Sequence, residues 1–244
     1  GVVNAIRFYL GRYGRPLLYL AWFLALAGLL PGGAYEAFLR PEFGVLLGAA
    51  VVVLLGFLAT EMGRPPTPPE PIFGETIRVL ILALPLAYLS IGRGVALDSG
   101  AFANRWTGPA GAAGATTAGE PQAASATSET AAREADLVGL CWDSETYEGK
   151  EVAVEGMLHH EPEVAQRYGG NGWLLYRFVV SCCAADAQPA AVMLTGDMAT
   201  NWTDDAWVRA TGRFTLRPDQ PRPVPILELG TLAPMKKPRN PYLY

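Results

Sequence analysis

The feature that most constrains this chain is an apolar run without a single charge at residues 43–60. Its sequence reads FGVLLGAAVVVLLGFLAT. A helix needs about 20 mostly apolar residues to cross the hydrocarbon core of a bilayer. A helix in the core of a soluble protein keeps a polar stripe on its solvent side, and this run has none. We therefore predict a membrane-spanning helix at about residues 43–62.

Two further apolar runs flank this one. The first, at residues 16–30, continues through a glycine pair, and we expect a span at about 16–38. It indicates an anchor rather than a removed leader, because more apolar segments follow it. The third gives an expected span at about 76–97, although Pro85 and Arg93 interrupt it. The sequence thus predicts two or three transmembrane α-helices in an anchor that covers residues 1–97.

Arginine residues near the ends of these runs indicate how the anchor is oriented. With three spans, five positive residues fall on the N-terminal side of the membrane and three on the other. Positive residues concentrate on the cytoplasmic side, so we predict a cytoplasmic N-terminus. The C-terminal domain then lies on the non-cytoplasmic side. If the third run does not span, that domain is cytoplasmic instead.

The distribution of charged residues separates the first part of the chain from the second. Only 17% of the residues are charged, against roughly 25% in an average soluble domain. Residues 1–135 hold nine acidic and nine basic residues, whereas residues 136–244 hold fourteen and ten, so the second part carries the net charge of −4. Residues 98–135 are rich in Ala, Gly, Ser and Thr, and this composition predicts a flexible linker.

Residues 136–244 read as a soluble, all-β domain. Asp136 is placed to cap a short helix at 136–143, and five alternating or β-branched segments follow. Gly212 lies inside one of them, where we expect a bulge or bend. Five short strands of this kind predict an OB-like Greek-key barrel, and an open sandwich is the alternative. Because the domain is acidic, we expect no nucleic-acid partner. The predicted strands are 151–158, 173–181, 190–194, 206–216 and 225–232.

Few residues of this domain could carry chemistry. Cys182, Cys183, Asp186, Cys141 and His159 are the speculative metal ligands, because thiolate, imidazole and carboxylate suit zinc or copper. Adjacent residues of an extended strand point to opposite faces, so we expect that both neighbouring cysteines rarely bind one ion. No cofactor is otherwise expected. We also expect both adjacent histidines to lie exposed on the surface.

The three cysteines leave three interpretations open. If the domain is exported, Cys141 could form a disulfide with Cys182 or Cys183. Alternatively, all three are structural thiols, or they serve a metal or redox function. The sequence holds no GxSxG, P-loop or HExxH motif, and the acidic pair Asp204 and Asp205 is expected to cap a turn or face solvent. We therefore expect no enzymatic activity.

Several motifs of the C-terminal half resemble a known family. The run RFVVSCCAADAQP at 177–189, together with segments at 147–150, 205–212 and 240–244, is similar to the YcgQ-type family of uncharacterised bacterial membrane proteins. Members of that family are regarded as permease subunits. The resemblance implies a partner, a larger multi-span membrane protein of the permease type. It implies no substrate and no active site.

These observations predict a membrane-anchored, non-enzymatic accessory subunit of a permease, with a β-barrel tethered at the membrane surface. The first alternative is a structural or accessory subunit of a large multi-subunit membrane complex. In that case the tail would dock on a partner through Pro241, Tyr242 and Tyr244. A further alternative is a metal-binding or redox protein that uses Cys182 and Cys183.

Overall fold

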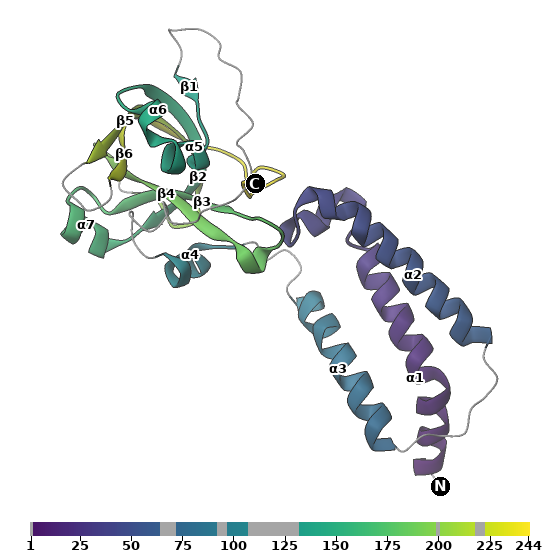
Figure 1. The fold of residues 1–244 in the computed structure, drawn as a ribbon. Coiled ribbons are helices and arrows are strands. Elements are labelled where there is room, and N and C mark those ends of the chain that lie inside the picture. Colours follow the sequence, from purple (N-terminus) through teal and green to yellow (C-terminus); the bar gives the residue numbers. More distant parts are fainter. Residues whose placement is uncertain (1, 64–71, 92–96, 107–131, 199–200, 218–222) are drawn as a thin grey trace. The chain divides into compact units, whose positions relative to one another are not determined.

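The computed structural model describes residues 2–63, 72–91, 97–106, 132–198, 201–217 and 223–244 (Figure 1). The chain divides into two compact units, Gly1–Val95 and Ala96–Tyr244. The first contains long helices and the second contains the β-sheet. Each unit is described by itself below.

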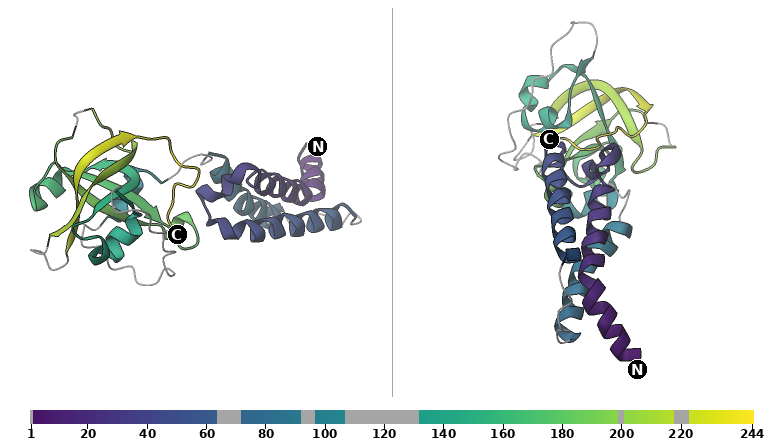
Figure 2. Two further views of the ribbon diagram at one scale, coloured as in Figure 1. Left: turned by 90° about the horizontal axis from the view of Figure 1, so that it is seen from above. Right: turned by 90° about the vertical axis from the view of Figure 1, so that its right-hand side faces the viewer.

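The first unit is a set of three helices, α1 (Val2–Ala27), α2 (Gly44–Gly63) and α3 (Ile72–Ile91). α1 contacts both of the others, as the views in Figure 2 show. The indole Nε1 of Trp22 in α1 donates a hydrogen bond of 3.0 Å to the backbone oxygen of Leu82 in α3. Between α1 and α2 the chain turns through two short 3₁₀ segments, η1 (Pro31–Ala37) and η2 (Pro41–Phe43).

Among the described residues, one helix is long and apolar enough to cross a membrane. It extends over Pro41–Gly63 and almost none of it is buried within the protein, which agrees with the span predicted at 43–62. The segments Tyr13–Ala27 and Pro31–Ala37 would meet the same requirement as one broken span, with a bend of 95° between them. α3 coincides with the third apolar run, and its crossing of a membrane stays a prediction.

The second unit is built around a closed barrel of five strands. β2, β3, β4, β6 and β5 pair in that order, and β5 pairs back onto β2. All neighbours are antiparallel except β4 and β6. The prediction of a five-stranded barrel is therefore confirmed, with the strands close to the expected segments. The strands are β2 (Glu151–His160), β3 (Trp173–Val179), β4 (Gln188–Thr195), β5 (Trp207–Arg217) and β6 (Val224–Pro234).

The expected irregularity at Gly212 is also present. The register between β5 and β6 shifts between Thr211 and Gly212. A β-carbon added at Gly212 would lie 2.1 Å from the backbone oxygen of Glu228, so only glycine fits here. A bulge of this kind increases the local twist and bend of a strand, which helps a narrow barrel to close.

A short helix before β2 packs on the core of the barrel. α5 (Leu137–Trp142) begins where predicted, because the Asp136 carboxylate accepts a hydrogen bond of 2.6 Å from the amide of Gly139. Its apolar side, including Leu137 and Leu140, is buried in a core shared with β2, β3, β4 and β5. Further short elements of this unit are β1 (Arg133–Glu134), α6 (Ser144–Tyr147) and α7 (Pro162–Tyr168).

Part of the expected linker is folded against the barrel. α4 (Ser99–Arg105) lies within residues 98–135, and its N-cap Asp98 accepts a hydrogen bond of 3.1 Å from the amide of Ala101. Phe102 of this helix is fully buried, and its ring centroid lies 4.3 Å from that of Tyr176 in β3. The composition of residues 98–135 as a whole, which is dominated by small and polar residues, did not reveal this contact. Residues 107–131 of the expected linker lie outside the described residues.

Candidate thiol and carboxylate site

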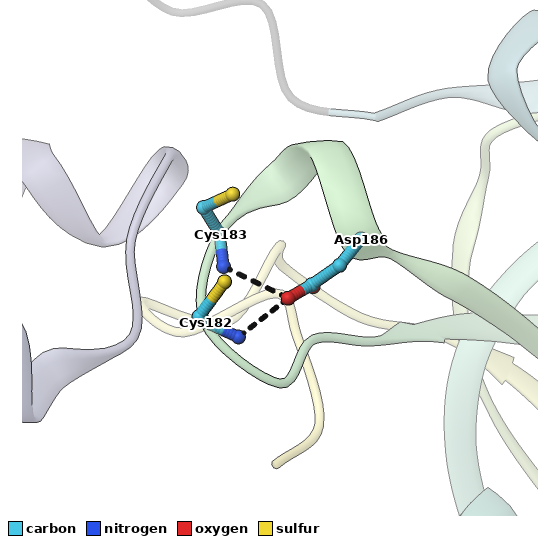
Figure 3. Close-up of side chains that lie close together, drawn as sticks. All are labelled: Cys182, Cys183 and Asp186. Atoms are coloured by element: carbon cyan, nitrogen blue, oxygen red, sulfur yellow. Dashed lines mark hydrogen bonds between the residues drawn. The ribbon is translucent and has the colours of Figure 1, made fainter.

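The neighbouring cysteines lie in the turn that joins β3 to β4. β3 ends at Val179, two residues before the predicted strand end, and a 3₁₀ segment η4 (Ala184–Asp186) precedes β4. Cys182 is exposed, whereas Cys183 and Asp186 are half-buried. The two sulfur atoms and a carboxylate oxygen of Asp186 all lie within 4.8 Å of one another (Figure 3). The expectation of opposite faces was wrong here, because it holds for an extended strand and not for a turn.

The backbone of the turn holds the Asp186 carboxylate in place. Its Oδ2 accepts hydrogen bonds from the amides of Cys182 at 2.7 Å and Cys183 at 3.4 Å (Figure 3). Its Oδ1 accepts one from the amide of Ser181 at 3.1 Å. Burial alone would raise the pKa of this carboxyl. The hydrogen bonds from the Cys182 thiol and from these three amides outweigh burial and lower it below 3.8. Asp186 is therefore a fixed negative charge beside two thiols.

That charge keeps Cys182 protonated. The hydrogen bond to Asp186, and next the one to Cys183, raise the pKa of the Cys182 thiol from 9.0 to about 11. Since the thiolate is the nucleophile and the metal ligand, this thiol is not an activated nucleophile. Cys183 is held by the turn itself, because its side chain accepts a hydrogen bond from the amide of Asp186.

Two of the predicted ligands do not join this cluster. Among the described residues, the only group of three or more ligand atoms is Cys182, Cys183 and Asp186. Cys141 lies buried on α5, where its Sγ donates to the backbone oxygen of Ala191 at 3.5 Å and burial raises its pKa to about 12. All three cysteines are free thiols in the structure.

His159 is buried, which corrects the expectation of two exposed histidines. Its ring is tilted against that of Phe102, with centroids 5.0 Å apart. Nε2 lies 3.5 Å from Glu161 Oε2, and Nδ1 lies 3.6 Å from Asp204 Oδ2. Only His160 is exposed as expected. The cause of the difference is α4, which covers the side of β2 that bears His159.

Asp205 has a role that sequence reasoning missed. Its carboxylate accepts hydrogen bonds from the Tyr176 hydroxyl at 2.8 Å, the Ser99 amide at 2.7 Å and the Ser99 hydroxyl at 2.8 Å. The pKa of Tyr176 is raised, mainly by burial and to a smaller extent by the hydrogen bond to Asp205. Asp205 thus connects α4 to the barrel instead of facing solvent. The helix cap at Asp98 was the available sequence signal for α4.

The C-terminal tail packs on its own barrel. Pro241 and Tyr242 are buried and Tyr244 is half-buried. The amide of Leu243 donates to Phe178 of β3, and the Leu243 oxygen accepts from Val180, both at 2.9 Å. Docking of Pro241, Tyr242 and Tyr244 on a partner stays a prediction, and the tail would contribute to it as part of a folded surface.

Comparison with protein families gives a match in the second unit. Residues 137–244 match the model of the DUF1980 C-terminal domain, an uncharacterised domain family. The matched segment contains the five strands and the turn with Cys182, Cys183 and Asp186, whereas α4 and β1 precede it. No curated protein and no solved structure matches the chain.

Proposed function

We propose that this protein is a membrane-anchored, non-enzymatic accessory subunit of a larger, permease-like membrane protein. The observation that carries the proposal is α2, whose apolar side chains are exposed around the helix. Val45, Leu46 and Val52 are 81%, 63% and 69% exposed. Soluble proteins rarely expose such an apolar surface, and a bilayer or the spans of another protein would cover it.

The barrel is the second component of the proposal. Its strand order, with a parallel pair between β4 and β6 and closure between β5 and β2, supports the assignment to OB-like Greek-key barrels. Such a domain serves chiefly as a binding platform. The resemblance to permease subunits supports a role beside a membrane protein, with the N-terminus in the cytoplasm as the arginine distribution predicts.

Purification in a mild detergent tests this proposal. We expect one multi-span membrane protein to be recovered with the full chain in a fixed molar ratio. Replacement of residues 1–95 by an unrelated membrane anchor should abolish recovery if the helices provide the contact. Recovery with many subunits would instead favour a structural role in a large complex. If the partner is still recovered in the same molar ratio after the replacement, the contact lies in the barrel.

A further inference from the structure

We infer that the turn between β3 and β4 is a zinc site in which Cys182, Cys183 and Asp186 provide three ligands. The fourth position of the ion is left to solvent or to a donor from outside this chain. This inference goes beyond the accessory role, and it holds or fails without any membrane partner.

The positions of the donor atoms suit one small cation. Zinc binds sulfur at about 2.3 Å and carboxylate oxygen at about 2.0–2.2 Å, so tetrahedral ligand atoms lie about 3.5–3.8 Å apart. The three donor atoms here already lie within 4.8 Å of one another. Rotation of the exposed Cys182 side chain and a small adjustment of Cys183 would bring the donor atoms to the shorter distances of a tetrahedral site.

Asp186 is oriented before any ion arrives. A carboxylate offers about four acceptor directions, and the amides of Ser181, Cys182 and Cys183 use three of them. The Cys182 thiol donates to the same carboxylate. A cation between sulfur and oxygen would take the place of that thiol proton. On binding, each thiol releases one proton to solvent and its sulfur lone pair forms the bond to Zn²⁺.

The donor set favours zinc over copper. Two thiolates and one carboxylate carry a charge of −3 against the +2 of the ion, and zinc accepts both sulfur and oxygen donors. Cu(I) prefers soft sulfur donors alone, and Asp186 is a hard donor. Structural zinc sites usually have four protein ligands. A half-exposed site with three of them is suited to an ion that exchanges.

The test is a zinc titration of the full chain, free of tags, in mild detergent with a phosphine reductant. A chromophoric chelator competes for the metal and reports the affinity. We expect one Zn²⁺ per chain, and with Co²⁺ a thiolate-to-cobalt charge-transfer band that reports sulfur ligation. Cys182→Ser and Cys183→Ser should each weaken binding at least tenfold, and Asp186→Asn should weaken it about tenfold.

Cys141→Ser is the matched control, because it removes a thiol that lies outside the cluster. It should leave stoichiometry and affinity unchanged. Circular dichroism checks that each variant keeps the barrel, and Asp186→Glu, which retains a carboxylate, should recover part of the affinity. Stoichiometric, unweakened zinc binding in both Cys182→Ser and Cys183→Ser would overturn the inference. An equal loss in Cys141→Ser, or cobalt without the charge-transfer band, would overturn it as well.

Discussion

At the scale of single residues, Gly212 has no room for a side chain. Its missing side chain lets β5 and β6 approach until a β-carbon would lie 2.1 Å from the Glu228 oxygen. Overpacking usually costs about 1–3 kcal/mol, and a clash with backbone lies at or above the upper end. We expect Gly212→Ala to lower the unfolding free energy of the barrel by about 3 kcal/mol, measured by urea denaturation followed by near-ultraviolet circular dichroism.

Gly230→Ala is the control for this substitution. Gly230 lies next to the same bulge, but its added β-carbon would meet nothing closer than 3.5 Å. We expect a change below about 1 kcal/mol. Equal effects of the two substitutions would show that the close approach at Gly212 is not the cause.

Cys141 should make the barrel less stable as the pH rises through the alkaline range. Burial raises the pKa of its thiol from 9.0 to about 12. Because the folded state keeps the proton that the unfolded state loses, this contribution is fully present below pH 9 and is lost as the pH rises toward 12. The slope for one proton is about 1.4 kcal/mol per pH unit.

The slope is measured by urea denaturation between pH 8 and 10.5. Cys141→Ala should reduce this pH slope by up to the value for one proton. The unfolding free energy of this variant should also fall, because the substitution removes buried packing. Gly230→Ala, which removes no titratable group, should keep the slope of the unmodified protein. A slope unaffected by Cys141→Ala would mean that this thiol titrates alike in the folded and unfolded states.

At the scale of elements, one side chain of β3, that of Arg177, helps to hold the C-terminal tail on the barrel. The Arg177 guanidinium donates to the backbone oxygens of Asn240 at 3.0 Å, Pro241 at 3.1 Å and Tyr242 at 3.2 Å. Hydrogen bonds from a charged donor contribute about 1.5–3 kcal/mol. We expect Arg177→Ala to release the tail, with carboxypeptidase digestion at least tenfold faster than in the unmodified protein.

Arg213→Ala controls for the loss of an arginine from the barrel. Its guanidinium makes an exposed hydrogen bond of 3.2 Å to the Gly149 oxygen, which lies outside the tail. Digestion should then proceed at the original rate. Slow digestion of Arg177→Ala would show that the backbone bonds between Leu243 and β3 are sufficient to hold the tail.

At the scale of the whole molecule, membrane attachment is predicted to depend on α2. An arginine at the centre of a span costs about 3 kcal/mol. Val52→Arg combined with Leu55→Arg should therefore move a large part of the full chain from the membrane pellet into the alkaline carbonate extract. Met62→Arg places the same charge near the helix end, where the side chain reaches the interface, and should leave the pellet unchanged. If the amount of the double variant in the membrane pellet does not change, other segments provide the attachment.

Local pattern alone determined much of this protein. The helix over the apolar run at 43–60, the cap at Asp136, the five strands and the bulge at Gly212 were all predicted correctly. Each depends on hydrophobic period, on a single side chain next to its own backbone, or on the steric freedom of glycine. Such information lies within a few residues, so the sequence displays it directly.

Only the tertiary structure decided how the distant parts meet. α4 contacts the barrel through Ser99 and Asp205, which are 106 positions apart, and the Leu97 amide meets the Tyr242 hydroxyl across 145 positions. These contacts bury His159, contrary to expectation. The turn that brings Cys182, Cys183 and Asp186 together is local, but its geometry depends on where β3 ends. Pairing between strands sets that position, and no periodicity in one strand reveals the register of its neighbours.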